Sequence, residues 1–351
     1  MSELSDFLIE RRKRRKRALL IFSIIIALCL IAATSFLAWR IITDTEASTS
    51  PQEFGKDSEK IDKPNASEEK PSQKEQKAQE KLLSEEKMLE ALSKELADMM
   101  LSEFPETDLS FGIKNLDTGA QIYYNNKQMN SASVIKLFIL ETVYKGVSDG
   151  SYFLTESGKK DLEIMITESN NNAANNFIDD FGGQNEKRKI EETNSINRTI
   201  KESGYEHTEI NRKMHDTTPP EGPSGYQNYT SPKDVVKFLE GIYNRTLLEE
   251  PYNSQTMELL KNQRRRGKIP AQIVNKYPSV VVANKTGELS QVENDVAIIM
   301  CEDFNLIFAL FTDNIALNEN GSTNYDRKEQ VQKTISTMAL RLVEAYKNKM
   351  K

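Results

Sequence analysis

The stretch NSASVIKLFILETVY, residues 130–144, predicts a helix that is apolar on nearly every face and is therefore buried in the core of a folded domain. Ser133 stands at its start and Lys136 follows one turn later, so the two side chains share a helix face. A lysine among so many apolar neighbours is desolvated, which lowers its pKa and makes it a usable base for the serine hydroxyl. The same pair would also suit an N-cap serine followed by a lysine whose ammonium group reaches solvent.

Two further short motifs lie downstream of this helix. Ser-Asn-Asn at 169–171 precedes a stretch rich in Ala and Asn, and Lys-Thr-Gly at 285–287 follows the apolar run SVVVAN. Each motif alone is also typical of ordinary structure, because Ser and Asn favour helix starts and turns, and a Gly after an apolar run marks many strand ends. The order of the three motifs, each in a suitable local context, favours a shared catalytic site.

The pattern of apolar residues around these motifs predicts a mixed fold. We expect a first amphipathic helix at 82–103, a hairpin of two strands at 109–116 and 120–126, a mostly helical block at 133–263, three strands at 279–286, 295–300 and 305–312, and a last helix at 325–347. This layout predicts an α/β (α+β) domain. One antiparallel sheet carries the N- and C-terminal helices on one face, and a helical lobe lies between the two halves of the sheet.

The N-terminal region has the composition of a membrane anchor followed by a spacer. Residues 18–39 carry no charge and would span about 33 Å as a helix, enough for a bilayer core. The basic run in residues 1–17 predicts a cytoplasmic N-terminus and an extracytoplasmic body at the plasma membrane, in a single-pass topology. A cleaved signal peptide is the alternative, although its apolar core would be shorter. The charged stretch 40–81 predicts a disordered tether, or a solvated helix from about Gln73 onward.

Charge and cysteine content exclude several other functions. The net charge of the chain is −6. Residues 1–17 alone carry a charge of +4, so the remaining 334 residues carry −10. This acidic main part argues against nucleic acid as a partner. Only two Cys and two His are present, so neither a disulfide scaffold nor a zinc enzyme is expected, and no metal or organic cofactor is implied. An exported domain without disulfides fits a Gram-positive type of cell surface.

The three motifs together resemble those of the penicillin-recognising serine enzymes, and most closely class A β-lactamases. The resemblance extends over residues 85–351, since ASVIK, SNNNAAN, DTT, KIP, NKTGEL and ENDVAII occur in family order. It implies a β-lactamase/transpeptidase-like fold for a single domain at 82–351. It also implies a substrate that is either a β-lactam or the acyl-D-Ala-D-Ala peptide of peptidoglycan.

The resemblance assigns a role to each matching residue. Ser133 resembles the acylated nucleophile, Lys136 its base, and Ser169 the proton shuttle to the leaving nitrogen. The expected substrate-binding residues are Asn171 for the acylamino side chain, Lys285 and Thr286 for the substrate carboxylate, and Gly287 beside them. The backbone N–H groups of Ser133 and Glu288 would form the oxyanion hole.

Three departures from the family pattern bear on activity. Asn170 replaces an Asp that is mostly structural. Met214 occupies the position of the Glu that activates the deacylating water, so deacylation should be slow by about 10²–10⁴-fold. His215 or Asp216 could substitute for that Glu if the loop shifts by one residue. The carboxylate-binding arginine of many class A members is missing, and its charge could come from the basic run at 264–266, through Arg264 or Arg266.

The sequence therefore predicts a membrane-anchored extracytoplasmic serine hydrolase that forms an acyl-enzyme on Ser133 with β-lactams. Two alternatives stay open at this point. One is a D-Ala-D-Ala carboxypeptidase or another cell-wall peptidase, which the tether favours. The other is a non-catalytic domain that binds or senses wall fragments, which the altered deacylation loop favours.

Overall fold

A computed structural model of the chain describes residues 73–183, 185, 189–191, 194–215 and 227–349. The predicted cytoplasmic tail, the membrane anchor and the tether up to residue 72 lie outside the described residues. Within the described part, no helix combines the length and the apolar character that a membrane span requires. Residues 73–148 and 152–351 form one compact unit.

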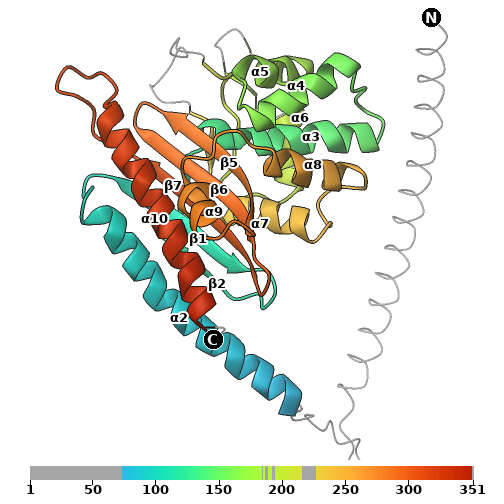
Figure 1. The fold of residues 1–351 in the computed structure, drawn as a ribbon. Coiled ribbons are helices and arrows are strands. Elements are labelled where there is room, and N and C mark those ends of the chain that lie inside the picture. The colour runs from blue at the N-terminus through green and yellow to red at the C-terminus, as the bar shows by residue number, and fades with distance from the viewer. Residues whose placement is uncertain (1–72, 184, 186–188, 192–193, 216–226, 350–351) are drawn as a thin grey trace, which may run out of the picture. The chain divides into compact units, whose positions relative to one another are not determined.

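The centre of this unit is a five-stranded antiparallel sheet with the strand order β2-β1-β7-β6-β5. The strands are β1 (Asp108–Asn115), β2 (Gln121–Tyr124), β5 (Val281–Leu289), β6 (Val292–Met300) and β7 (Asn305–Asp313). The predicted hairpin is confirmed, because β1 pairs with β2 around a turn in which Gly119 takes a φ of +79°. The sheet places the first two strands beside the last, so distant parts of the sequence meet in one layer (Figure 1).

Three helices cover one face of the sheet. They are α2 (Gln73–Leu101), α9 (Ile269–Lys276) and α10 (Tyr325–Lys349), and α10 packs against both of the others (Figure 1). Because successive side chains of a strand point to opposite faces of the sheet, every second residue contributes to the core beneath these helices. In β7, Phe308 and Leu310 join this core, whereas Ile307 and Ala309 join the core on the other face. The predicted placement of both terminal helices on one face is therefore confirmed.

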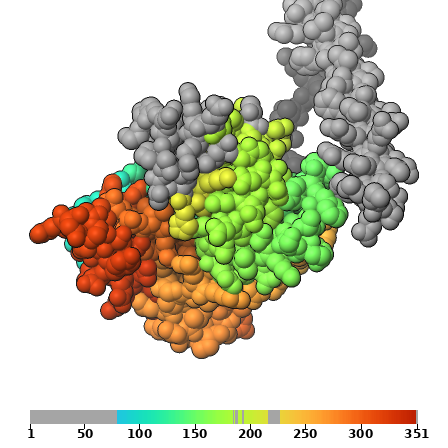
Figure 2. All heavy atoms as spheres, turned by 90° about the horizontal axis from the view of Figure 1, so that it is seen from above, coloured from blue at the N-terminus to red at the C-terminus, as the bar shows by residue number. Residues whose placement is uncertain are grey.

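The helical lobe occupies the middle of the chain and packs on the opposite face. It contains the 3₁₀ helix η1 (Ala132–Ile135) and the helices α3 (Lys136–Ser148), α4 (Glu156–Thr167), α5 (Asn171–Asp180), α6 (Ser195–Glu202), α7 (Pro232–Tyr243) and α8 (Tyr252–Lys261). Helix α7 contacts β1, β6 and β7, and α8 contacts β5. Two short paired strands, β3 (Met129–Asn130) and β4 (Tyr229–Thr230), flank η1. Figure 2 shows the green spheres of the lobe directly beside orange spheres from the later part of the chain.

Two of the boundaries that differ from the sequence-based expectation are informative. Helix α2 begins at Gln73, which is where the alternative interpretation placed the start of a solvated helix. Strand β6 begins at Val292 instead of residue 295. Its first residues include Glu293 and Asn294, which are polar yet fully buried. A search for apolar patterns cannot identify such residues as part of a strand.

Candidate active site

Ser133 and Lys136 lie at the junction of η1 and α3, where the apolar helix enters the core. Lys136 is 0% exposed, and its Nζ lies 2.9 Å from Ser133 Oγ. Burial, with a smaller contribution from the positive charge of Arg265, lowers the pKa of Lys136 to about 7. A large fraction of this lysine is therefore a neutral amine near pH 7, and it can accept the serine proton.

The backbone around Ser133 is held in a tight arrangement against β5. Ala132, the preceding residue, has a φ of +45°, which is uncommon for a residue with a side chain. Gly287 of β5 passes so close that a Cβ there would lie 2.8 Å from the Ser131 carbonyl oxygen. Because only glycine avoids this clash, Gly287 sets the distance between the nucleophile and the strand that carries Lys285 and Thr286.

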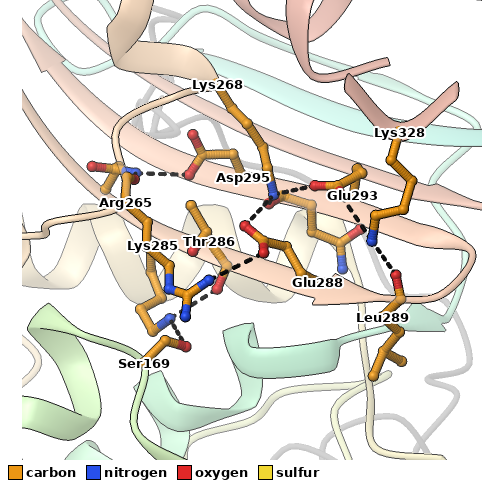
Figure 3. Close-up of polar contacts among 12 residues, drawn as sticks. Ser169, Arg265, Lys268, Lys285, Thr286, Glu288, Leu289, Glu293, Asp295 and Lys328 are labelled. Carbon is orange, nitrogen blue, oxygen red and sulfur yellow. Dashed lines mark hydrogen bonds and ion pairs between the residues drawn. The ribbon is translucent and has the colours of Figure 1, made fainter. Parts of the chain in front are cut away.

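Ser169 connects the two lysines of the site. Its Oγ lies 2.8 Å from Lys285 Nζ and 3.3 Å from Lys136 Nζ, and its carbonyl oxygen accepts a 2.7 Å hydrogen bond from Lys136 (Figure 3 shows the contact with Lys285). Ser169 has a φ of +62°, which turns the chain between α4 and α5. A hydroxyl in this place can pass a proton between either lysine and a bound substrate.

Asn170 and Asn171 complete this loop in different ways. Asn170 is the N-cap of α5, and its Oδ1 accepts a 3.0 Å hydrogen bond from the Ala173 backbone N–H. It therefore does the structural work of a cap. Asn171 Oδ1 accepts a 2.6 Å hydrogen bond from Lys136 Nζ, so this side chain orients the lysine and lies beside the nucleophile.

Lys285, the first residue of the Lys-Thr-Gly motif in β5, is completely buried. Its Nζ also donates a 2.8 Å hydrogen bond to the Thr286 carbonyl oxygen. Burial and the nearby charge of Lys136 hold the pKa of Lys285 well below its usual range. Thr286 is buried as well and faces Asp295 of β6 across the ladder. The six residues Ser133, Lys136, Ser169, Asn171, Lys285 and Thr286 thus form one continuous cluster.

An open pocket of about 390 Å³ adjoins this cluster, lined by residues 168–172 with His215 and Arg265. Met214 does not line it. The side chain of Met214 is only 9% exposed and packs in the core of the helical lobe, while its backbone N–H and C=O both bond to Asn175 at 2.8 and 3.0 Å. His215 has a φ of +58°, which reverses the chain direction and allows its side chain to line the pocket. Asp216 lies outside the described residues.

The three consecutive arginines point in different directions, and Arg265, which the sequence analysis did not single out, is the one that lines the pocket. Arg264 pairs with the Glu168 carboxylate at 2.5 Å at the surface, and Arg266 donates to the Val282 carbonyl oxygen. Arg265 lines the pocket instead, and its Nη1 lies 3.2 Å from Glu288 Oε2. The sequence offered no signal for this choice, because side-chain direction in a loop depends on the local turn geometry.

Among the described residues, no group of three or more His, Cys, Asp or Glu side chains could hold a metal ion. The chemical groups that the structure brings together are a serine hydroxyl, two desolvated lysines, a bridging hydroxyl and an arginine at the pocket. This set can transfer an acyl group to Ser133 with protons moving through Lys136, Ser169 and Lys285.

Comparison with known proteins agrees with this arrangement. The model of the beta-lactamase enzyme family matches residues 91–162 and 159–346. No curated protein matches the sequence. The fold is similar to that of the beta-lactamase from Sphaerobacter thermophilus DSM 20745, with a TM-score of 0.57 and 20% identity over 70% of this chain and 96% of that chain.

Two further solved structures show the same likeness. One is a mutant of PBP-A solved as an acyl-enzyme complex with penicillin G, with a TM-score of 0.57 and 22% identity over 71% of this chain and 96% of that chain. The other is an ancestral class A beta-lactamase (GNCA), with a TM-score of 0.59 and 17% identity over 72% of this chain and 99% of that chain. At these identities the likeness establishes the fold, and the predicted β-lactamase-like architecture is confirmed.

Proposed function

The chain belongs to the beta-lactamase enzyme family, and on that premise we propose that it is a serine hydrolase that forms a long-lived acyl-enzyme on Ser133 with β-lactams. The observation that carries this proposal is the 2.9 Å contact between Ser133 Oγ and the buried Lys136 Nζ. A domain that only bound wall fragments would gain nothing from a nucleophile with its base desolvated beside it.

The proposed reaction follows from the positions of these groups. Ser133 Oγ attacks the carbonyl carbon of the cyclic amide while its proton passes to the neutral amine of Lys136. The ring C–N bond then breaks and leaves the acyl group as an ester on Oγ. The departing nitrogen takes a proton from the Ser169 hydroxyl, which is replenished by the ammonium of Lys136 or Lys285. Backbone N–H groups of Ser133 and Glu288 would stabilise the oxyanion.

The slow second step is part of the proposal. Hydrolysis of the ester needs a water molecule from which a base removes a proton, and general-base catalysis is typically worth about 10²–10⁴-fold. The Met214 thioether cannot accept that proton, and its side chain is turned into the core. We therefore expect penicillin-binding behaviour, with acylation faster than deacylation.

The proposal also includes a location. Residues 1–17 would lie in the cytoplasm, residues 18–39 would anchor the chain in the plasma membrane, and the hydrolase domain would act outside, on a Gram-positive type of surface. The support is the uncharged 22-residue stretch behind seven basic residues. At such a place the natural substrate would be a β-lactam or the peptidoglycan peptide that β-lactams mimic.

Intact-mass measurement of the full-length chain in mild detergent, incubated with benzylpenicillin, tests the proposal. We expect one whole penicillin to be added per chain, because ring opening loses no atoms, and we expect the adduct to persist. Ser133→Ala should abolish it. Met214→Leu should leave the adduct lifetime unchanged, because the Met214 side chain packs in the core and supplies no base for deacylation.

Two results would contradict the proposal in different ways. Destruction of penicillin with no adduct would mean that another base, such as His215, supports fast deacylation. Intact penicillin with no adduct would exclude β-lactams as substrates and would favour a narrower cell-wall peptidase or a binding domain.

A further inference from the structure

Five side chains of alternating charge run from the pocket to the start of α10, in the order Arg265, Glu288, Lys268, Glu293 and Lys328 (Figure 3). We propose that Glu288 is a positioning residue of the active site, which acts by holding Arg265 in the orientation that receives the substrate carboxylate. This inference rests on the proposed function and adds a specificity-determining group to it.

Arg265 is held from two separate elements. Its Nη1 lies 3.2 Å from Glu288 Oε2 on β5, and its Nε donates a 3.2 Å hydrogen bond to the Glu168 carbonyl oxygen in the loop before α5. These two contacts fix the plane of the guanidinium across the pocket that it lines. Among the described residues, none bonds to Nη2, so this amino group is available to an incoming carboxylate.

The orientation would not be fixed without such contacts. The Arg265 side chain is 52% exposed, and a free arginine side chain loses rotamer entropy when it is ordered. An arginine that is ordered before the substrate arrives spares the substrate that cost. Glu288 is therefore better described as an anchor of Arg265 than as a competitor for its charge.

Glu288 is itself fixed on its other side. Its Oε1 lies 3.2 Å from Lys268 Nζ. Burial tends to raise the pKa of Glu288, but the charges of Lys268 and Arg265 outweigh it, and the net pKa lies below the usual value. The carboxylate is therefore ionised at neutral pH and attracts both cations at once.

The far end of the array explains why Lys268 cannot move. Lys268 is 2% exposed, its Nζ lies 2.6 Å from an oxygen of the completely buried Glu293, and it donates a 3.0 Å hydrogen bond to the Asn294 carbonyl oxygen. The second oxygen of Glu293 lies 2.9 Å from Lys328 Nζ at the start of α10. Because buried charges are costly to separate, Lys268 is held in place at this end of the array, and it in turn holds the Glu288 carboxylate.

A double-mutant cycle on the full-length chain in mild detergent tests the inference. The rate constant for acylation is measured by intact mass with benzylpenicillin and with its methyl ester, which lacks the carboxylate charge. We expect Glu288→Gln to slow acylation by benzylpenicillin about tenfold, the size of a typical coupling between contacting residues. The ester should react at the same rate with the wild type and with this variant.

The cycle identifies the residue through which Glu288 acts. Arg265→Gln should slow benzylpenicillin by at least as much, and adding Glu288→Gln to it should cause no further loss. Arg264→Gln is the matched control, because Arg264 is adjacent and charged but pairs at the surface. Glu288→Asp keeps the charge on a shorter side chain, so its rate with benzylpenicillin should lie between those of the wild type and Glu288→Gln. If Glu288→Gln does not fold, the cycle uses Glu288→Asp, which should still lose part of the rate with benzylpenicillin and none with the ester.

Three outcomes would overturn the inference while leaving the proposed function intact. The first is faster acylation of Glu288→Gln by benzylpenicillin, which would mean that Glu288 competes with the substrate carboxylate for Arg265. The second is a loss of rate with the methyl ester equal to the loss with benzylpenicillin. The third is a double variant in which the losses of the two single variants add. A wild-type chain that forms no adduct with either compound would instead overturn the proposed function, and this inference with it.

Discussion

At the scale of single residues, the reactivity of Ser133 depends on the protonation state of Lys136. A lysine in water is charged at neutral pH and has no lone pair to offer. In this site the ammonium form has lost its hydration, and the pKa falls to about 7. The hydrogen bonds to Ser169 and Asn171 keep the amine directed at the nucleophile in both of its protonation states.

This dependence predicts the pH profile of acylation. The base must be neutral, so the rate should rise with pH through about 7 and then level off. Arg265→Gln removes a positive charge that helps to lower the pKa of Lys136, so the pKa rises and the midpoint should move to higher pH. The midpoint is measured from the rate of acylation by the benzylpenicillin methyl ester, followed by intact mass from about pH 5.5 to about 9, a range that brackets a pKa of about 7. The ester is used because it has no carboxylate whose binding to Arg265 would change in the variant.

Arg264→Gln is the control for charge in the same loop, and its midpoint should stay with that of the wild type. A midpoint that is unchanged or lower in Arg265→Gln would contradict the electrostatic coupling between Arg265 and Lys136.

Sequence reasoning reached most of the candidate site but did not single out Arg265, the arginine that lines the pocket. Ser133 and Lys136 follow from helix periodicity, and the order of motifs brought Ser169 and Lys285 to them, as the structure places them. The choice of Arg265 over its two neighbours depends on a turn between α8 and α9 whose backbone no local pattern specifies. The burial of Met214 likewise depends on two hydrogen bonds from Asn175, which lies 39 residues earlier in the chain.

At the scale of elements, the two terminal helices are joined through one buried carboxylate. Glu85 of α2 is 1% exposed. It accepts hydrogen bonds from Asn115 Nδ2 at 2.7 Å and from Tyr346 Oη at 2.8 Å, and it lies 3.0 Å from Lys349 Nζ. One side chain therefore connects α2, β1 and α10, and it closes the end of the layer that covers the sheet.

Removing this carboxylate should destabilise the domain. We expect Glu85→Ala to lower the free energy of unfolding by about 2–4 kcal/mol, because buried donors and a cation lose their partner. Glu90→Ala is the matched control on the same helix, since Glu90 pairs only with the exposed Lys94, and it should cost less than about 0.5 kcal/mol. Urea unfolding of a chain that begins at residue 73 measures both values.

The pH dependence of the same variant has a definite sign. Burial tends to raise the pKa of Glu85, but the bonds from Tyr346, Lys349 and Asn115 outweigh it and hold the pKa below 4.5. The stabilisation is therefore complete above about pH 4.5, the unfolded value, and is lost as the pH falls through the folded pKa. A difference between wild type and Glu85→Ala that grows on acidification would contradict this assignment.

Elements were predictable where their stability comes from apolar periodicity, and less so where it comes from buried polar groups. The hairpin at β1 and β2 and the helix α10 needed only alternation, helical spacing and a Gly turn. The start of β6 was missed because Glu293 and Asn294 are buried by partners from the residue before α9, from α10 and from β7, which a local pattern cannot contain. The charged start of α2 was open to both interpretations because its sequence is rich in charge and poor in large apolar residues, which suits a tether and a solvated helix equally.

At the scale of the whole molecule, the compact unit that begins at residue 73 accounts for the chemistry, and the preceding 72 residues account for where it would act. The stretch 18–39 would cross a bilayer of about 30 Å as a single helix. Insertion of such a helix is effectively irreversible, whereas binding through the basic run alone would be electrostatic and salt-sensitive.

This difference predicts how the full-length chain fractionates. Expressed in a Gram-positive host, it should stay in the membrane pellet after washes with alkaline carbonate and with about 1 M salt, which shortens the Debye length to about 3 Å. A chain beginning at residue 73 should not stay in the pellet. Protease added to intact protoplasts should remove the hydrolase domain and leave the N-terminal segment protected, because in the proposed topology the domain would lie outside. A mature N-terminus near residue 40, found by mass in the soluble fraction, would instead identify 18–39 as a cleaved signal peptide and place a free hydrolase beyond the membrane.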